Sequence, residues 1–141
     1  MREFKFSLEK VLVYRLQLEK QAKNNYASIQ KIVNDKQDNI QKVVQEKKQM
    51  LSVPEYTVSR MQVQQRYIAD LDRIALTLQT EIDSLQGKLR DALEEYVNAQ
   101  QKRKIMEKLK ENKKADYIIL EKREEQKLLD ELSNRRILNI K

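Results

Sequence analysis

The side chains of this chain that could take part in acid or base chemistry are carboxylates, amines, guanidines and phenols. The sequence has no histidine and no cysteine, which excludes Ser-His and Cys-His nucleophiles and ordinary zinc sites. Its single glycine excludes the glycine-rich loops that hold nucleotide phosphates. Adjacent carboxylates occur as Glu94-Glu95 and Glu124-Glu125, but neighbouring residues on a helix point apart. We therefore expect no enzyme, no metal site and no cofactor.

A continuous apolar stripe identifies the element that carries many of these charged groups. Between residues 68 and 99, apolar side chains recur in alternating steps of three and four residues. A mean step of about 3.5 residues keeps a stripe on one side of an α-helix and is typical of coiled coils, whereas strand side chains alternate between two faces. The predicted seam positions are Ile68, Leu71, Ala75, Leu78, Ile82, Leu85, Leu89, Ala92, Tyr96 and Ala99.

The composition leaves little material for loops. One glycine and one proline in 141 residues, with 36% charged and 6% aromatic residues, are typical of long solvated helices. Apolar runs such as residues 117–120 are far shorter than the roughly 20 residues of a membrane span, and no signal peptide is visible. The absence of cysteine fits a reducing compartment. We expect a soluble, cytoplasmic protein.

The strongest break in the helical pattern is Ser52-Val53-Pro54. Pro54 disfavours helical geometry at Val53 but suits the first turn of a following helix. The sequence therefore predicts an all-α, antiparallel two-helix coiled-coil hairpin with a longer C-terminal helix, as a single domain over residues 1–141. The first helix is expected at about 5–51, the bend at 52–54 and the second helix at about 55–139. Such a bend places Phe4 near Lys102, so that everything from about residue 103 projects without an internal partner.

A second, weaker stripe runs through the first helix. It is interrupted by five polar residues, so its seam is expected to be less apolar than that of the second helix. The predicted positions are Phe4, Leu8, Val11, Arg15, Leu18, Ala22, Asn25, Ile29, Ile32, Lys36, Asn39, Val43, Lys47 and Met50.

Apolar residues exceed the needs of a two-helix seam in two places. The first turns of the first helix are apolar around most of the circumference, with Phe4, Phe6, Leu8, Val11, Leu12, Val13, Tyr14, Leu16 and Leu18. On the second helix the stripe meets Arg103, Lys110 and Lys113 before it recovers at Tyr117 and Leu120. Surplus apolar surface marks a contact site. A covering second helix or self-association accounts for the first place equally well, and a register shift accounts for the second.

The net charge of +7 raises the question of nucleic acid as a partner. Basic residues are concentrated in residues 1–51 and 103–141, whereas residues 52–102 are slightly acidic. The lysines are interleaved with acids, no run of five basic residues exists, and no aromatic-basic RNA-binding motif occurs. We expect no nucleic-acid binding and no direct membrane insertion, so that any membrane attachment is peripheral and through a partner.

Both ends of the chain carry patterns of a known family. The opening Phe4-x-Phe6-x-Leu8-x-x-Val11-Leu12-x-x-Arg15 resembles the start of the flagellar FliJ family of export proteins. The segments Arg103-x-x-Met106-Glu107-Lys108-Leu109 and Arg123 through Glu131 resemble the closing helix of that family. The resemblance covers essentially the whole chain.

The resemblance implies a non-enzymatic, stalk-like component of the flagellar type III protein export apparatus. Family members insert into the ring of the export ATPase, promote its assembly and activity, and contact the membrane export gate; some also recycle export chaperones. The implied location is cytoplasmic, peripheral at the inner membrane through the export apparatus. Carried over to this sequence, the residues that contact the ATPase ring are Phe4, Phe6, Leu8, Val11, Leu12 and Arg15, with Arg123, Gln126, Asp130 and Glu131 near the end.

A second class of function fits the same pattern. A structural or adaptor coiled coil would act as a self-associating scaffold or as an escort of export chaperones, with seams that pair between chains. Sedimentation separates the two: the stalk is expected to be a monomer of 16.9 kDa when free, and the scaffold a stable dimer or larger.

Overall fold

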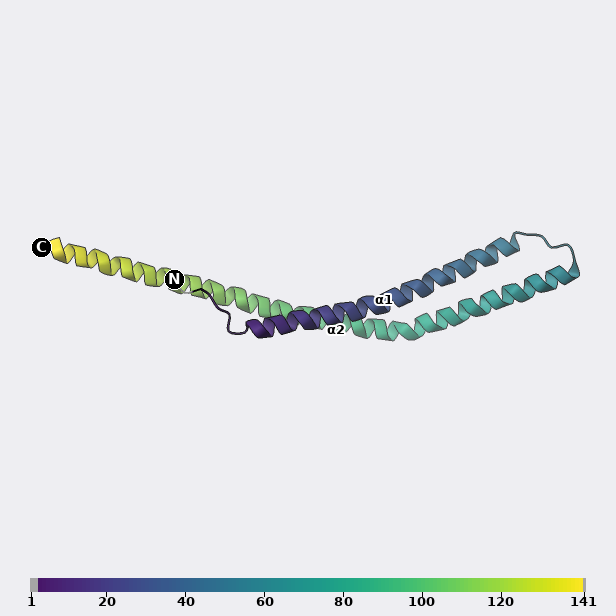
Figure 1. Cartoon of the computed structure of the whole chain (residues 1–141), viewed down its shortest axis with the longest axis horizontal. Coiled ribbons are helices and arrows are strands. Elements are labelled where there is room, and N and C mark those ends of the chain that lie inside the picture. Colours follow the sequence, from purple (N-terminus) through teal and green to yellow (C-terminus); the bar gives the residue numbers. More distant parts are fainter. Residues whose placement is uncertain (1–2, 141) are drawn as a thin grey trace. The chain divides into compact units, whose positions relative to one another are not determined.

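Two long helices form the molecule (Figure 1), shown as a computed structural model. The structure describes residues 3–140, and the side chains of residues 3–136. Helix α1 spans Glu9–Leu51 and helix α2 spans Val58–Ile140, and no strand occurs in the described part of the chain. The predicted all-α fold, an antiparallel helical hairpin with a longer second helix, is confirmed.

The chain divides into two compact units, and each contains a stretch of both helices. Unit 1 consists of Met1–Glu19 and Asn98–Lys141, and unit 2 of Lys20–Val97. Within each unit the stretch of α1 runs antiparallel to the stretch of α2. Whether the whole chain behaves as one domain, as the sequence led us to expect, stays a prediction.

The seam of α2 consists of side chains that are all buried or half-buried. Leu71, Ile82 and Ala92 are the most buried, with 3–4% of their surface exposed, and Ile68, Ala75, Leu78, Leu85, Leu89, Tyr96 and Ala99 are half-buried. In unit 2 the facing side of α1 supplies Val33, which is 2% exposed. This apolar seam serves as the hydrophobic core of the fold, because two paired helices can bury only one stripe of side chains on each helix.

The predicted stripe of α1 is wrong at four positions of one of its two columns of side chains, whereas Leu18 of the same column is half-buried as predicted. Val11 and Ile32 are 37% and 46% exposed, and Asn25 and Asn39 are exposed as well. The residues that follow them are buried or half-buried instead, namely Leu12, Tyr26, Val33 and Ile40. The observed stripe therefore loses both asparagines and is more apolar than the sequence suggested. Its positions keep steps of three and four residues: Leu12, Arg15, Glu19, Ala22, Tyr26, Ile29, Val33, Lys36, Ile40, Val43, Lys47 and Met50.

The connection between the helices covers residues 52–57 and is longer than the predicted bend at 52–54. Pro54 lies within it and does not open α2. Thr57 does so instead, because its Oγ1 accepts a hydrogen bond from the backbone N–H of Arg60 at 3.3 Å, as at a helix N-cap. At the other side, the Gln64 amide donates to the Met50 carbonyl at 2.6 Å and satisfies an acceptor at the end of α1. The first turns of α2 therefore run past the end of α1.

The start of the chain also differs from the expected helix at about residue 5. Helix α1 begins at Glu9, after a turn in which the Glu9 N–H donates to the Phe6 carbonyl at 3.2 Å. Phe4 does not lie near Lys102 as predicted, but packs against Tyr117 of α2. The register of the two helices explains the error. Glu9 pairs with Lys110 and Glu19 with Arg103, and the contact of Phe4 with Tyr117 continues the same register.

Candidate functional site

The segment before α1 folds against α2 within unit 1 and forms a hollow. The rings of Phe4 and Tyr117 lie with their centroids 5.5 Å apart and their planes tilted by 48°. The hollow has a volume of about 580 Å³. It is lined by Glu3, Phe4, Lys5, Phe6, Ser7 and Leu8 from the N-terminal segment and by Leu109, Lys113, Asp116, Tyr117 and Leu120 from α2.

The lining of this hollow suits the binding of a side chain rather than a reaction. Phenylalanine and leucine side chains form much of its wall, and Glu3, Lys5, Lys113 and Asp116 supply two charges of each sign. Among the described residues, no cluster of three or more potential metal ligands occurs. The geometry therefore fits an apolar contact with a polar edge.

A network of charged side chains, formed by Glu19 of α1 and by Arg103 and Glu107 of α2, joins the two helices in unit 1. The Arg103 guanidinium donates from Nε to Glu19 Oε2 at 2.5 Å and from Nη2 to Glu19 Oε1 at 3.2 Å, which is a bidentate pair. Its Nη1 donates to Glu107 Oε2 at 2.8 Å. The hydrogen bond to Glu19 raises the pKa of Arg103 further above its already high value. Because both side chains are less than a fifth exposed, this network sets the register of the two helices.

A second ion pair lies close to the start of α1. Lys110 Nζ lies 2.8 Å from Glu9 Oε2, and both side chains are partly exposed. Arg103 and Lys110 had counted in the sequence as interruptions of the apolar stripe. In the structure Arg103 and Lys110 each form an ion pair with a glutamate of α1. The contact between the two helices therefore continues past the last apolar seam position, through ion pairs.

The N-terminal group of predicted contact residues is divided by burial. Phe4 and Phe6 are half-buried and line the hollow together with Leu8, which is 40% exposed. Val11 is exposed and Arg15 is half-buried. Leu12, in contrast, is only 5% exposed and belongs to the seam. Its side chain is therefore the least accessible of this group.

The C-terminal group lies on the part of α2 that follows the hollow. All side chains from residue 122 to residue 136 are exposed, including Arg123, Gln126, Asp130 and Glu131. The Gln126 amide donates to Asp130 Oδ1 at 3.1 Å along the helix surface. None of the four lines the hollow, so the structure brings Phe4, Phe6 and Leu8 together but not the C-terminal group with them.

Sequence reasoning missed three features of this region. It placed the bare part of α2 from about residue 103, whereas contacts with the N-terminal segment extend to Leu120. It did not pair Glu19 with Arg103, although a charged residue at a seam position is a signal for a partner of opposite charge. It also missed three exposed leucines next to the predicted C-terminal residues: Leu128, Leu129 and Leu132, each 51–59% exposed.

A family of known proteins matches the chain over almost its whole length. The family described as "Flagellar FliJ protein" matches residues 4–140. No curated protein and no solved structure matches the chain. The matched range contains both helices and, apart from Glu3, every residue that lines the hollow. The chain therefore belongs to the FliJ family of flagellar proteins and is a component of the flagellar export apparatus.

Proposed function

We propose that this protein is a non-enzymatic stalk that docks in the ring of the flagellar export ATPase, promotes ring assembly and activity, and links the ring to the membrane export gate. The observation that carries the proposal is the bare stretch of α2, residues 122–136, whose side chains are all exposed. A cytoplasmic location at the inner membrane, held through the export apparatus, is part of the same proposal.

The bare stretch has the properties of a helix whose exposed apolar face is buried by a binding partner. Leu128 and Leu132 are spaced by four residues and lie on one face, with Leu129 beside them. An isolated helix of this length gains little stability from propensity alone, and an exposed apolar face on it supplies the surface that a partner buries. The surrounding Arg123, Asp130 and other charges provide a polar rim.

The hollow gives the proposed docking site a second part. It lies in the same unit and presents Phe6 and Leu8 beside α2, so a partner that surrounds the helix end meets apolar side chains from both chain termini. Phe4 and Tyr117 support the segment by their ring contact. Docking by this route requires no catalytic group of the protein itself.

The test compares nucleotide hydrolysis by the cognate ATPase with the full chain and with a version that ends at Lys122. This cut keeps every residue that lines the hollow and every interhelical ion pair described above. We expect the full chain to raise the hydrolysis rate and the shortened chain to lose that effect while it keeps its helical circular dichroism signal. Equal stimulation by both chains would contradict the proposal.

A pair of point variants narrows the test to the leucines. The double variant Leu128→Ser/Leu132→Ser should reduce stimulation, whereas Ile105→Ser should leave it unchanged. Ile105 is the matched control because it is 66% exposed in the same unit but lies before the bare stretch.

The scaffold alternative predicts a different outcome of sedimentation. If the bare leucines pair between copies, the full chain sediments as a dimer or larger species at low micromolar concentration and the Leu128→Ser/Leu132→Ser variant as a monomer. The stalk predicts monomers of 16.9 kDa in both cases. Capture of the export gate protein, or of export chaperones, by the full chain tests the remaining partners of the proposal.

A further inference from the structure

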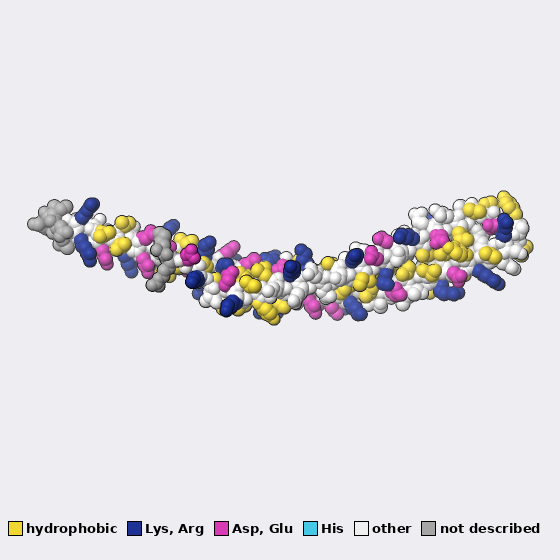
Figure 2. Space-filling view, viewed as in Figure 1, with side chains coloured by type: hydrophobic (Ala, Val, Ile, Leu, Met, Phe, Trp, Pro, Cys, Tyr) yellow, Lys and Arg dark blue, Asp and Glu magenta, His cyan; other side chains and the backbone are white. Residues whose placement is uncertain are grey.

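The connection between α1 and α2 carries an apolar surface that neither the helix seam nor the proposed docking site uses. Six large apolar side chains lie within thirteen residues, and each is 47–88% exposed. We call them the apex cluster: Leu51, Val53, Tyr56, Val58, Met61 and Val63. Figure 2 shows apolar side chains gathered at this end of unit 2, at the right of the view.

The apex cluster is not a stripe on one helix face. Each residue turns a helix by about 100°, so Met61 and Val63 point to opposite sides of α2. The side that faces α1 is occupied by Gln64, whose amide donates to the Met50 carbonyl. A partner groove recognises a helix through one face, with anchors three, four and seven residues apart. The apex cluster has apolar side chains on several sides of the connection. This arrangement fits an apolar environment that surrounds the apex rather than a groove that contacts one face.

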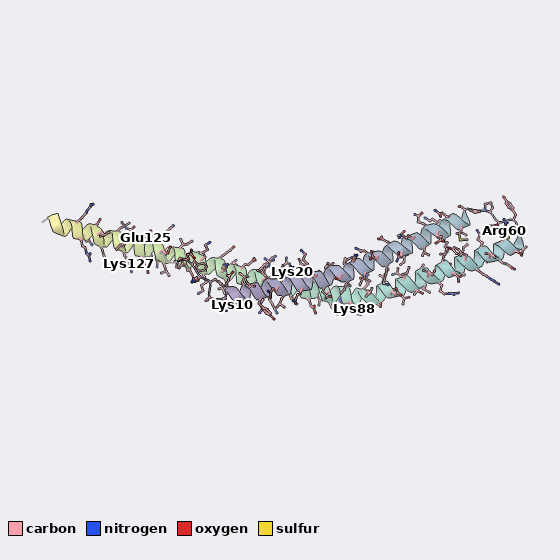
Figure 3. The ribbon with its side chains drawn as sticks, in the orientation of Figure 1. Lys10, Lys20, Arg60, Lys88, Glu125 and Lys127 are labelled. Atoms are coloured by element: carbon pink, nitrogen blue, oxygen red, sulfur yellow. The ribbon has the colours of Figure 1, made fainter. Side chains whose placement is uncertain are left out.

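Basic side chains stand around this apolar end. Lys48, Arg60 and Arg66 are exposed and form no ion pair within the described part of the chain, and Arg60 is labelled at the apex in Figure 3. The neighbouring Lys47 is already paired with Asp72 at 2.8 Å. Two carboxylates lie in the same region, namely Glu55 in the connection and Glu46, which accepts a hydrogen bond from Tyr67. Residues 46–66 carry four basic and two acidic side chains, so the charge near the apex is mainly positive.

We propose that the apex cluster binds the surface of a membrane that contains anionic lipids. The apolar side chains enter the boundary between headgroups and acyl chains, and Lys48, Arg60 and Arg66 contact lipid phosphates. Such a shallow contact needs no spanning segment, and none of the described helices is long and apolar enough to cross a bilayer. This site goes beyond the proposed docking in the ATPase ring and does not depend on it. It would give the protein a membrane contact of its own, in addition to any contact through the export gate, and so departs from the expectation from sequence that membrane attachment runs through a partner alone.

The test is co-sedimentation of the full chain with vesicles of equal parts phosphatidylglycerol and phosphatidylcholine, compared with vesicles of phosphatidylcholine alone. We expect binding to the anionic vesicles, weak or no binding to the neutral ones, and loss of binding as salt rises. The double variant Tyr56→Ser/Val58→Ser should bind about tenfold more weakly, because two apolar side chains leave the interface.

Two further variants test whether vesicle binding depends on the apex cluster: a matched control elsewhere on α2 and a variant expected to bind more tightly. Ile74→Ser/Leu76→Ser removes two exposed apolar side chains from α2 outside the apex cluster and should bind as the unchanged chain does. Glu55→Gln should bind the anionic vesicles several-fold more tightly, because it removes a negative charge at the apex. Circular dichroism of each variant establishes that the helices are retained.

Four outcomes overturn the proposal: no binding to anionic vesicles, equal binding to both vesicle types, an equal loss in the control variant, or binding insensitive to the serine changes at the apex. The last two would assign vesicle binding to a surface outside the apex cluster. Loss confined to Tyr56→Ser/Val58→Ser, together with tighter binding by Glu55→Gln, supports it.

Discussion

The two units pair the same two helices by different chemistry. In unit 2 the contact is mainly apolar, with Val33, Leu71, Ile82 and Ala92 almost fully buried. In unit 1 Leu12 is the one side chain of comparable burial among the residues whose side chains are described. Within the described part of the chain, two ion pairs join the helices in each unit. Those of unit 2, Lys36–Glu81 and Lys47–Asp72, accompany the apolar seam, whereas unit 1 relies on Arg103–Glu19, Lys110–Glu9 and the contact of Phe4, before α1, with Tyr117.

This difference fits a division between a stable unit and an adaptable one. Apolar burial contributes about 25 cal/mol per Å² and is not weakened by charge screening, whereas an ion pair such as Lys110–Glu9, with side chains 38% and 49% exposed, contributes little and is screened. Unit 1 contains the hollow and the bare stretch of α2, which are the surfaces that we propose for docking. A surface that must rearrange around a partner belongs to the less stable part of a fold.

The largest effect on stability is expected when a buried side chain of the apolar seam in unit 2 is shortened. Ile82→Ala should lower the free energy of unfolding by about 2–4 kcal/mol, because Ile82 is 3% exposed and its removal leaves a cavity between the helices. Urea unfolding followed by circular dichroism measures the loss. Ile74→Ala, at a position that is 49% exposed, is the control and should cost much less. Equal losses would show that the seam does not stabilise unit 2 as described.

A smaller effect is expected from the ion network of unit 1. Arg103→Ala leaves Glu19 and Glu107 facing each other without their shared cation, so the melting temperature should fall, though by less than in Ile82→Ala. The paired change Arg103→Met/Glu19→Leu removes both charges of the half-buried pair and keeps an apolar contact at the seam, so it should melt close to or above the unchanged protein. If Arg103→Ala melts no lower than Arg103→Met/Glu19→Leu, the unpaired carboxylate costs nothing and the network contributes nothing beyond packing.

The same contrast explains what the sequence could and could not predict. The seam of α2 is unambiguous because one column of side chains is apolar without interruption from Ile68 to Ala99. Along α1, adjacent positions compete: Val11 stands beside Leu12 and Ile32 beside Val33. The sequence of α1 alone cannot show which of two adjacent apolar residues is buried against α2, because this depends on how the two helices pack.

The errors at the helix ends have a different origin. Pro54 is a sound signal for the first turn of a helix, but the Thr57 cap and the Gln64 contact with the end of α1 determine where α2 begins. The fold of the N-terminal segment depends on Tyr117, more than a hundred residues away in the sequence. The predicted C-terminal residues lie on one exposed helix, and nothing in their spacing indicated that the contacts of the N-terminal segment end just before them.

A local effect is expected at the hollow. Phe4→Ala removes the ring that packs against Tyr117, so the amide hydrogens of residues 3–8 and 113–120 should exchange faster with solvent. The global unfolding midpoint should change little, because this contact involves a short segment outside α1. Leu51→Ala, at a position that is 61% exposed in unit 2, is the control. Unchanged exchange in Phe4→Ala would show that the ring does not hold the segment on α2.

The smallest expected effect concerns a hydrogen bond between the helices of unit 2. The Tyr67 hydroxyl donates to Glu46 Oε1, and this bond raises the pKa of Tyr67 above its ordinary value of 10.0. The folded chain therefore holds the phenolic proton more tightly than the unfolded chain. Its contribution to stability is fully present below pH 10.0 and is lost as the pH rises through the folded pKa, where a phenolate would face a carboxylate.

Tyr67→Phe isolates this contribution because it removes the hydroxyl and keeps the ring. The unchanged protein should be slightly more stable than Tyr67→Phe below pH 10.0, and the difference should vanish or reverse above it. Urea midpoints of both proteins across this range give the difference directly. Equal midpoints of the two proteins at every pH would mean that Tyr67 acts through its ring alone, because Tyr67→Phe keeps the ring and removes only the hydroxyl that bonds to Glu46.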